Sequence, residues 1–221
     1  MEELPVEFSD KALEASTIGV YQQQEIAEAY HRKWGHDTSP RINTCQEVFA
    51  NLLPEKKTVL DAGCASGRDV QNLLNLGVET VHGIDLSVSL LNFAKEEAPQ
   101  GIYTIGDIRK LPYTDESFDG INCINVFLHL QPESIRKSLS EFYRVLKPGG
   151  LIYLSTVADE NFNQRTSTTF GVERTIFRYP ESFLEKEIRD AGFDRHHIIR
   201  MGGESTDKPG HYVDLFIYKP V

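Results

Sequence analysis

The residues best suited to bind a ligand lie in the run Asp61-Ala-Gly-Cys-Ala-Ser-Gly67. Val59 and Leu60 precede it as a short apolar stretch, which is typical of a buried parallel strand. A glycine turn that leads from a strand into a helix presents free backbone N–H groups at the carboxyl end of the strand, where ligands of open α/β sheets bind. An acidic residue at this point repels phosphates and attracts cations, so Asp61 favours a ligand with an ammonium group.

The glycine spacing separates two kinds of nucleotide ligand. A dinucleotide-binding loop has the pattern G-x-G-x-x-G, and its third glycine lets the helix pack closely on the strand beside a pyrophosphate. Here that position holds Arg68, whose long charged side chain does not suit such packing. An NAD-dependent oxidoreductase is therefore the weaker alternative. A tight turn without a ligand would also explain the loop taken alone, so the motif needs support from elsewhere in the chain.

Two further acidic residues follow apolar runs. Asp85 ends the run 80–85 and lies 22 residues after Gly63, about the separation at which an acidic side chain reaches the ribose hydroxyls of a nucleotide. Its two oxygens can accept from two neighbouring hydroxyl groups. Asp107 follows a third apolar run in the same way. Either acid could be a solvated residue at a strand end, but their order along the chain favours one ligand site.

The motifs resemble those of the class I methyltransferases that depend on S-adenosylmethionine (SAM). The first motif of that family is an acidic residue followed by G-x-G-x-G, and this chain departs from it at Ala65. The run Arg144-Val-Leu-Lys-Pro-Gly-Gly150 resembles the family's turn from a helix into the fifth strand. The resemblance covers residues 58–156. It implies an α/β fold with a Rossmann-like, doubly wound sheet of seven strands, mostly parallel, whose antiparallel last strand lies between the fifth and the sixth.

The same resemblance implies which residues contact the cofactor. SAM is the expected cofactor and S-adenosylhomocysteine the product. Asp107 is expected to accept a hydrogen bond from the adenine amino group, a role that suits an acceptor-only carboxylate, and Ile108 is expected to cover the base. The expected cofactor contacts are Asp61, Gly63, Cys64, Ala65, Gly67, Asp85, Leu86, Asp107, Ile108, Asn125 and Tyr30.

The segments outside the common motifs are expected to bind the acceptor. Residues 1–56 are predicted to form helices that cap the cofactor, and residues 57–221 the methyltransferase core, with a polar insertion at about 157–179. The stretch 21–34 resembles the family's N-terminal helix, although a helix packed on the sheet edge would show the same pattern. One arginine of the insertion is expected to hold an anionic group such as a carboxylate. The expected substrate contacts are Tyr21, Trp34, Arg165, Arg174, Arg178 and His211.

Helix and turn signals predict the remaining elements. Ser39-Pro40 marks the start of a helix over 41–53, and helices are also predicted over 19–33, 132–147 and 180–191. Ser87 is predicted to cap a helix that follows the second strand. Two last strands are predicted over 195–201 and 211–218, joined by the turn-rich residues 202–210.

His129 is the best candidate for a catalytic base, since imidazole titrates near neutral pH and the residue follows the fourth predicted strand. A histidine that hydrogen-bonds the backbone below the site explains the residue without catalysis, and we favour this interpretation. Many methyl transfers need no base, because the positive sulfur already activates the methyl group.

Composition argues against several partners. The net charge of −10, from 33 acidic and 23 basic residues, opposes a nucleic-acid or anionic-membrane surface. No apolar stretch approaches the roughly 18 residues of a membrane span. The acidic start Met1-Glu-Glu3 is unlike a signal peptide, so we expect a cytoplasmic protein. The three cysteines lack C-x-x-C spacing, and we expect neither a disulfide nor a metal site.

We therefore expect a methyltransferase that acts on a small molecule, which could bear a carboxylate or be a peptide terminus. The N/D-P-P-Y/F loop that methylates exocyclic amines of nucleic-acid bases is missing after the fourth predicted strand, where the chain has Asn125-Val-Phe-Leu128. A SAM-binding protein without catalytic activity is the alternative from another class. No pattern in the sequence identifies the acceptor atom or the oligomeric state.

Overall fold

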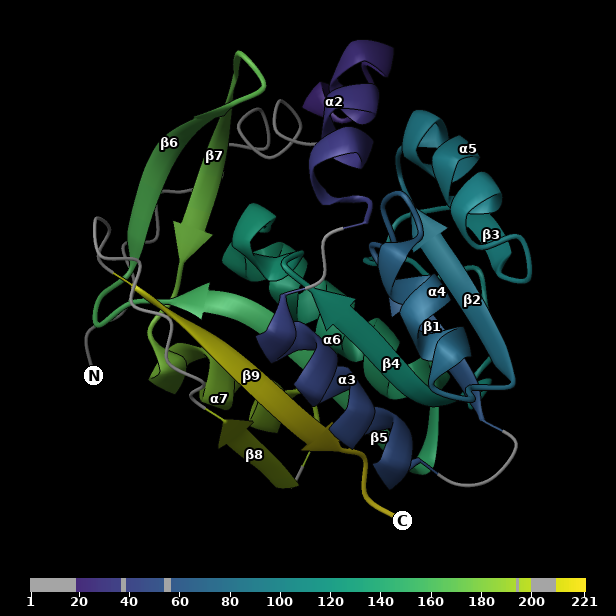
Figure 1. Ribbon diagram of the computed structural model, residues 1–221. Coiled ribbons are helices and arrows are strands. Elements are labelled where there is room, and N and C mark those ends of the chain that lie inside the picture. The colour runs from purple at the N-terminus through teal and green to yellow at the C-terminus, as the bar shows by residue number, and fades with distance from the viewer. Residues whose placement is uncertain (1–18, 37–38, 54–56, 194, 200–209) are drawn as a thin grey trace.

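A computed structural model describes residues 19–36, 39–53, 57–193, 195–199 and 210–221 of the chain (Figure 1). Seven strands form one sheet in the order β3-β2-β1-β4-β5-β9-β8. β9 is antiparallel to both of its neighbours, and the other neighbouring pairs are parallel. The strands are β1 (Thr58–Ala62), β2 (Thr80–Asp85), β3 (Ile102–Ile105), β4 (Phe118–Ile124), β5 (Leu146–Ala158), β8 (Arg195–Ile199) and β9 (His211–Tyr218). The predicted sheet, with its last strand between the fifth and the sixth, is confirmed.

Helices cover both faces of the sheet. Successive side chains of a strand point to opposite faces, so Val59 packs with one group of helices and Leu60 with the other. The first face is covered by α3 (Pro40–Leu52), α4 (Arg68–Asn75) and α5 (Val88–Glu97), and the second by α6 (Pro132–Val145) and α7 (Glu181–Asp190). Burial on both faces explains the apolar strand runs of the sequence. Within the described ranges, no helix is long and apolar enough to cross a membrane.

The two helices of the N-terminal segment lie in different places, one at the end of the sheet and one packed on its face. α2 (Gln24–Trp34) begins later than the predicted helix 19–33 and lies beside α5, at the end of the sheet where β2 ends (Figure 1). α3 instead packs on the sheet through Ile42, Cys45 and Phe49. Among the described residues before 57, only 19–36 are therefore placed to cover a ligand. Residues 1–18 lie outside the described part of the chain.

Two helix boundaries show how local signals act. Ser87 caps α5 as predicted, since its Oγ accepts from the backbone N–H of Leu90 at 3.2 Å. α6 ends at Val145, two residues before the predicted end. The reason is that Lys147 precedes Pro148, and a residue before proline avoids the helical conformation. The predicted residues 200–201 of the penultimate strand and the connection 202–209 lie outside the described ranges.

The polar insertion forms a β-hairpin, which the sequence analysis did not predict. β6 (Asn163–Thr169) and β7 (Val172–Arg178) pair antiparallel with Thr169 opposite Val172. Phe170 and Gly171 make the turn, and both have positive φ, 56° and 76°, as the tight turns of hairpins require. The many threonines of this segment were an available signal, because β-branched residues favour strands.

Candidate active site

A cleft of about 740 Å³ lies over the carboxyl ends of β1, β2 and β4. The strand order reverses at β1, and ligands of open α/β sheets bind at such a point. α2 and the β6–β7 hairpin stand at this end of the sheet (Figure 1). The predicted site residues that line the cleft are Tyr21, Tyr30, Trp34, Gly63, Cys64, Ala65, Asp85, Leu86, Asp107, Ile108, Asn125, His129, Arg174, Arg178 and His211. Three others, Asp61, Gly67 and Arg165, are not among the lining residues.

The loop after β1 is held by its own backbone. The N–H groups of Gly63 and Cys64 both donate to the carbonyl of Ile84, at 2.8 and 3.0 Å, and the N–H of Gly67 donates to the carbonyl of Cys64 at 3.0 Å. Gly63 and Gly67 have φ of 83° and 87°, which glycine adopts readily. A Cβ on Gly67 would lie 2.8 Å from Cα of Ala94. Gly67 is therefore needed for the turn and for the approach of α5.

Ala65 takes the backbone conformation that a glycine would favour. Its φ is +46°, a left-handed conformation that costs an L-residue roughly 1–2 kcal/mol. Its N–H donates to Oδ2 of Asp85 at 2.9 Å. The departure from the family motif at Ala65 therefore changes a side chain but does not change the shape of the loop.

Asp61 is a buried acidic residue beneath this loop. It is 2% exposed, its Oδ1 accepts from Nδ2 of Asn122 at 2.6 Å, and its Oδ2 has no hydrogen-bond partner. Burial, and after it the charge of Asp69, raises the pKa of Asp61 well above its usual value, while the hydrogen bond from Asn122 opposes this shift. A buried oxygen without a donor is costly. An ammonium group would provide both a donor and a compensating charge.

Asn122 is a candidate site residue that the sequence analysis missed. It lies opposite Asp61 in the register of β4 against β1 and is completely buried. Its side-chain oxygen is 3.4 Å from Nε2 of Gln46, so the amide is oriented from both sides. The available signal was a polar residue in the middle of an apolar strand, because a buried polar group requires partners.

Asp85 is fixed by backbone donors. Its Oδ2 accepts from Ala65 and its Oδ1 from the N–H of Ser87, at 2.9 and 2.8 Å. Burial raises the pKa of Asp85, and the backbone hydrogen bonds oppose the shift. Each carboxylate oxygen can accept a second hydrogen bond, so the residue keeps acceptor capacity for the two hydroxyls of a ribose.

Asp107 has a partner that the sequence analysis did not identify. Nε of Arg109 lies 2.9 Å from both carboxylate oxygens, and the backbone N–H of Arg109 is 2.8 Å from Oδ1. Burial alone would raise the pKa of Asp107, but the hydrogen bonds and charge of Arg109 lower it. The expected hydrogen bond from adenine to Asp107 therefore competes with Arg109. The spacing Asp-x-Arg was the only local signal of this pairing.

Arg174 and His129 lie together at the cleft. The guanidinium of Arg174 donates a short hydrogen bond to the hydroxyl of Tyr21, whose ring centroid is 5.7 Å from that of His129. Burial, and after it the charge of Arg174, lowers the pKa of His129 to about 3. A hydrogen bond with the backbone of Thr175 opposes this shift. The imidazole is therefore neutral at neutral pH.

Aromatic side chains connect α2 with the hairpin. The ring centroids of Tyr21 and Tyr30 are 5.8 Å apart, those of Tyr30 and Trp34 4.9 Å, and those of Trp34 and Phe170 5.0 Å. Phe170 was not predicted as a site residue, because its contact with Trp34 depends on how the hairpin is placed. All four rings of this row line the cleft.

The other predicted substrate residues are distributed differently. Arg178 lines the cleft and lies 3.7 Å from the carboxylate of Asp159. His211 also lines it, and its Nε2 is 2.7 Å from Oε1 of Glu181. Arg165 lies on the hairpin away from the cleft lining. Among the three predicted arginines, Arg174 is the one that contacts the aromatic row, through the hydroxyl of Tyr21 and the ring of Trp34.

The fold and the cleft define a nucleotide-binding α/β protein whose site favours a cationic ligand group. Comparisons with known proteins narrow this class. Residues 60–154 match the family described as methyltransferase domain. The chain is 31% identical over 187 residues to malonyl-[acyl-carrier protein] O-methyltransferase of Pectobacterium atrosepticum, covering 81% of this chain and 72% of the relative. It is 35% identical over 196 residues to the protein of the same name from Yersinia pestis, covering 88% and 68%.

A solved structure agrees with this relationship at the level of the fold. The 1,6-didemethyltoxoflavin-N1-methyltransferase of Burkholderia thailandensis, with bound S-adenosylhomocysteine, is similar with a TM-score of 0.71 at 19% identity, covering 94% of this chain and 90% of that chain. The chain belongs to the class I SAM-dependent methyltransferases, and its methyl donor is SAM.

The described residues fit this cofactor. Oδ2 of Asp61 is a buried acceptor without a donor, as an ammonium group at the strand end would need. A Cβ on Gly63 would collide with the side chain of Val126, so the glycine keeps the backbone open at the cleft. Asp85 retains acceptor capacity for two hydroxyls. These three residues would hold the amino-acid and ribose parts of SAM.

Proposed function

We propose that the chain methylates a carboxylate oxygen of a small acceptor, and that a malonyl group bound as a thioester is the first acceptor to test. The two malonyl-[acyl-carrier protein] O-methyltransferases that are 31% and 35% identical to this chain support the choice. The structural observation that carries the proposal is Arg174, a cation in the wall of the SAM cleft.

Arg174 has the chemistry to bind the acceptor. Its Nε is buried without a hydrogen-bond partner, and its guanidinium lies against the hydroxyl of Tyr21 and 5.9 Å from the ring centroid of Trp34. A guanidinium binds a carboxylate through parallel, charge-assisted hydrogen bonds. Arg178 already lies near Asp159, which makes Arg174 the stronger candidate.

The transfer depends on alignment. SAM provides a methyl group that its positive sulfur has already activated. A carboxylate oxygen of the acceptor would attack the methyl carbon, so that a C–O bond would form while the S–C bond breaks and its electron pair stays on sulfur. No proton moves in this step. Arg174 would hold the carboxylate so that one oxygen faces the methyl carbon, and holding two reactants in this way accounts for a large part of catalysis.

His129 acts in this proposal as a positioning residue. A group with a pKa of about 3 is a poor base at neutral pH, and a carboxylate acceptor is already ionised there. His129 instead packs beside Tyr21, which in turn contacts Arg174. Its role is to keep the ring of Tyr21 and the guanidinium in place.

Residues 19–36 and the hairpin would close the site. The aromatic row from Tyr21 to Phe170 joins these two segments, and exclusion of water strengthens the electrostatic contacts within a cleft. We propose that these two segments form part of the cap over SAM and its acceptor.

The test is methyl transfer from isotopically labelled SAM to malonyl-coenzyme A. Acetyl-coenzyme A is the matched control, because it is the same thioester without the free carboxylate. We expect a labelled methyl ester from the first compound, which releases labelled methanol in mild base, and no product from the second. Transfer to a small amine, with none to malonyl or other carboxylate acceptors, would overturn the proposal. The methyl donor would still be SAM.

A further inference from the structure

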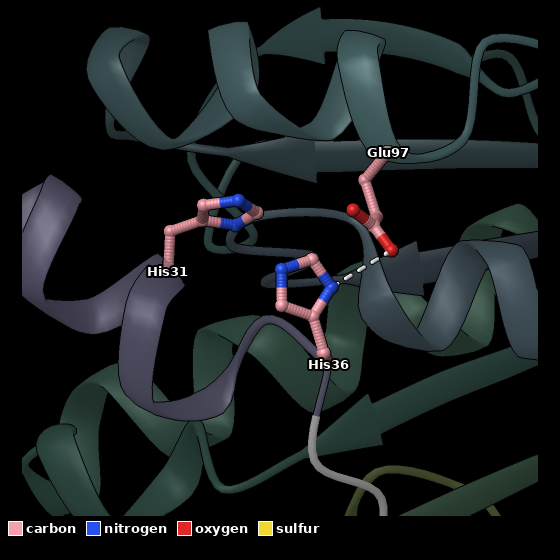
Figure 2. Close-up of side chains that lie close together, drawn as sticks. All are labelled: His31, His36 and Glu97. Carbon is pink, nitrogen blue, oxygen red and sulfur yellow. Dashed lines mark hydrogen bonds and ion pairs between the residues drawn. The ribbon is translucent and has the colours of Figure 1, made fainter.

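Three potential metal ligands meet at one side of α2, away from the residues assigned to SAM. They are His31 of α2, His36 just after its end, and Glu97 in the last turn of α5 (Figure 2). One ligand atom from each lies within 4.8 Å of the other two. Two imidazoles and one carboxylate form a donor set that zinc uses, with a fourth position left for water. The cysteine spacing predicted no metal site, and Glu97 lies 61 residues from His36 in the sequence.

The distances are close to those of a coordinated ion. Zinc bonds to nitrogen and carboxylate oxygen measure about 2.0–2.2 Å, so ligand atoms around a tetrahedral ion are about 3.3–3.5 Å apart. Nδ1 of His36 and Oε1 of Glu97 are already 3.2 Å apart. The ligand atoms all lie within 4.8 Å of one another, so the ligand atom of His31 and the other two need to approach by little more than about 1 Å. His36 has room to make this adjustment, because its side chain is 61% exposed.

His31 is prepared for such a role. Its ring stacks on Phe93, with centroids 4.5 Å apart and planes 10° from parallel, and also meets the ring of His36 at 4.9 Å. Its Nδ1 is buried without a hydrogen-bond partner. A Cβ on Gly35 would lie 2.5 Å from this atom, so the glycine leaves space for the ring. Buried polar atoms without partners are uncommon and call for an explanation.

We propose that His31, His36 and Glu97 bind Zn²⁺, and that the bound ion fixes the end of α2 to the end of α5. The start of the segment 19–36 is already joined to the residues just before α5. Nε2 of Gln22 donates to the carbonyl of Leu86 at 2.7 Å, and Oγ of Ser87 donates to the carbonyl of Tyr21 at 2.6 Å. A metal ion at the far end would hold the segment at both ends. Tyr30 and Trp34, which line the SAM cleft, lie between these two attachments.

The first test is zinc binding by full-length, untagged protein that has been stripped with EDTA. In competition with a chromogenic chelator, we expect one Zn²⁺ per chain and no binding of Mg²⁺, which prefers oxygen ligands. Loss of an outer-shell partner alone lowers metal affinity about 10–100-fold, so His36→Ala and Glu97→Gln should each lose at least about tenfold. His31→Phe should do the same while it keeps the ring stacked on Phe93. His197→Ala, which removes an exposed histidine of β8, is the matched control.

Thermal unfolding provides a readout that does not depend on activity. At a zinc concentration about 100 times Kd, Tm should rise by about 5–10 °C in the wild type and in the control, and by much less in the three ligand variants. A wild type that binds no zinc would overturn the proposal. So would zinc binding that all three ligand variants retain, or that His197→Ala loses to the same extent.

SAM binding tests whether bound zinc fixes the end of α2 to the end of α5. If zinc holds α2 against α5, saturating Zn²⁺ should tighten SAM binding in the wild type, and SAM should tighten zinc binding by the same factor. Glu97→Gln should show neither effect. One bound zinc with an unchanged Kd for SAM would refute the connection to the cap. It would leave the proposed methyl transfer to a carboxylate unaffected, because that transfer rests on Arg174.

Discussion

Nδ2 of Asn122 lies 2.6 Å from Oδ1 of Asp61, across the register of two central strands. This hydrogen bond satisfies one oxygen of a buried carboxylate and leaves the other without a donor. The parallel pairing of β1 and β4 brings together two residues 61 positions apart. The pair therefore leaves a buried acceptor at the end of β1, where the ammonium group of SAM is expected to bind.

Asp61→Asn is predicted to weaken SAM binding without unfolding the protein. Hydrogen bonds to charged groups contribute about 1.5–3 kcal/mol, so the Kd for SAM should rise about 10–150-fold. The fold should persist, because the variant also removes the cost of a buried charge. Isothermal calorimetry and Tm without SAM measure the two effects. A fall in Tm as large as that of a core truncation would show that Asp61 is instead a structural residue.

The stability change of this variant should depend on pH. The folded chain raises the pKa of Asp61, so the protonated form is favoured on folding, and stability from this group falls as pH rises through the raised pKa. Asn does not titrate. The Tm of Asp61→Asn should therefore exceed that of the wild type at pH 7.5, and the difference should shrink on acidification below the raised pKa. A difference that grows on acidification would contradict the shift.

Arg174→Gln is predicted to impair acceptor binding selectively. Loss of charge-assisted hydrogen bonds should lower kcat/KM for a carboxylate acceptor by about 10–100-fold, mainly through KM, with the Kd for SAM within about threefold. Arg165→Gln is the matched control, since Arg165 lies on the same hairpin outside the cleft lining. Equal losses in both variants would indicate a general effect on the hairpin.

His129→Asn tests the histidine directly. Because burial and Arg174 keep the pKa of His129 at about 3, kcat/KM should show no ionisation from this residue between pH 6 and 8.5. The variant should keep the shape of the pH profile and lose less than about tenfold in kcat, since general-base catalysis is typically worth more than about 100-fold. A rising limb near pH 6.5 that disappears in the variant would restore the catalytic-base interpretation.

Substitution of the two small residues Ala65 and Gly67, in the loop after β1, should affect stability to very different extents. Ala65→Gly relieves a positive φ but adds backbone freedom to the unfolded chain, so the free energy of unfolding should change by less than about 1 kcal/mol. Gly67→Ala combines a positive φ with a Cβ 2.8 Å from Cα of Ala94 and should cost about 2–5 kcal/mol. Urea denaturation measures both, and a stable Gly67→Ala variant would contradict the close approach of α5.

The sequence predicts the common core well, because its signals are local. The run 58–67 contains its own strand, acid and glycine turn, and the positive φ of Gly63, Ala65 and Gly67 follows from that turn. The prolines and glycines that end helices act within a few residues. These patterns, together with Asp85, were enough to identify the fold and the methyl donor.

Side-chain partners across the molecule are decided only by the tertiary structure. Asn122 reaches Asp61 through strand register, and Trp34 meets Phe170 through the placement of a hairpin. Glu97 meets His31 of α2 and His36, just after that helix, through helix packing. Arg109 donates hydrogen bonds to the carboxylate of Asp107, which was expected to bind adenine. Electrostatic shifts such as that of His129 arise from burial and from charges distant in sequence. Local residue patterns therefore determine the scaffold and its cofactor, whereas the acceptor side depends on contacts that exist only once the chain has folded.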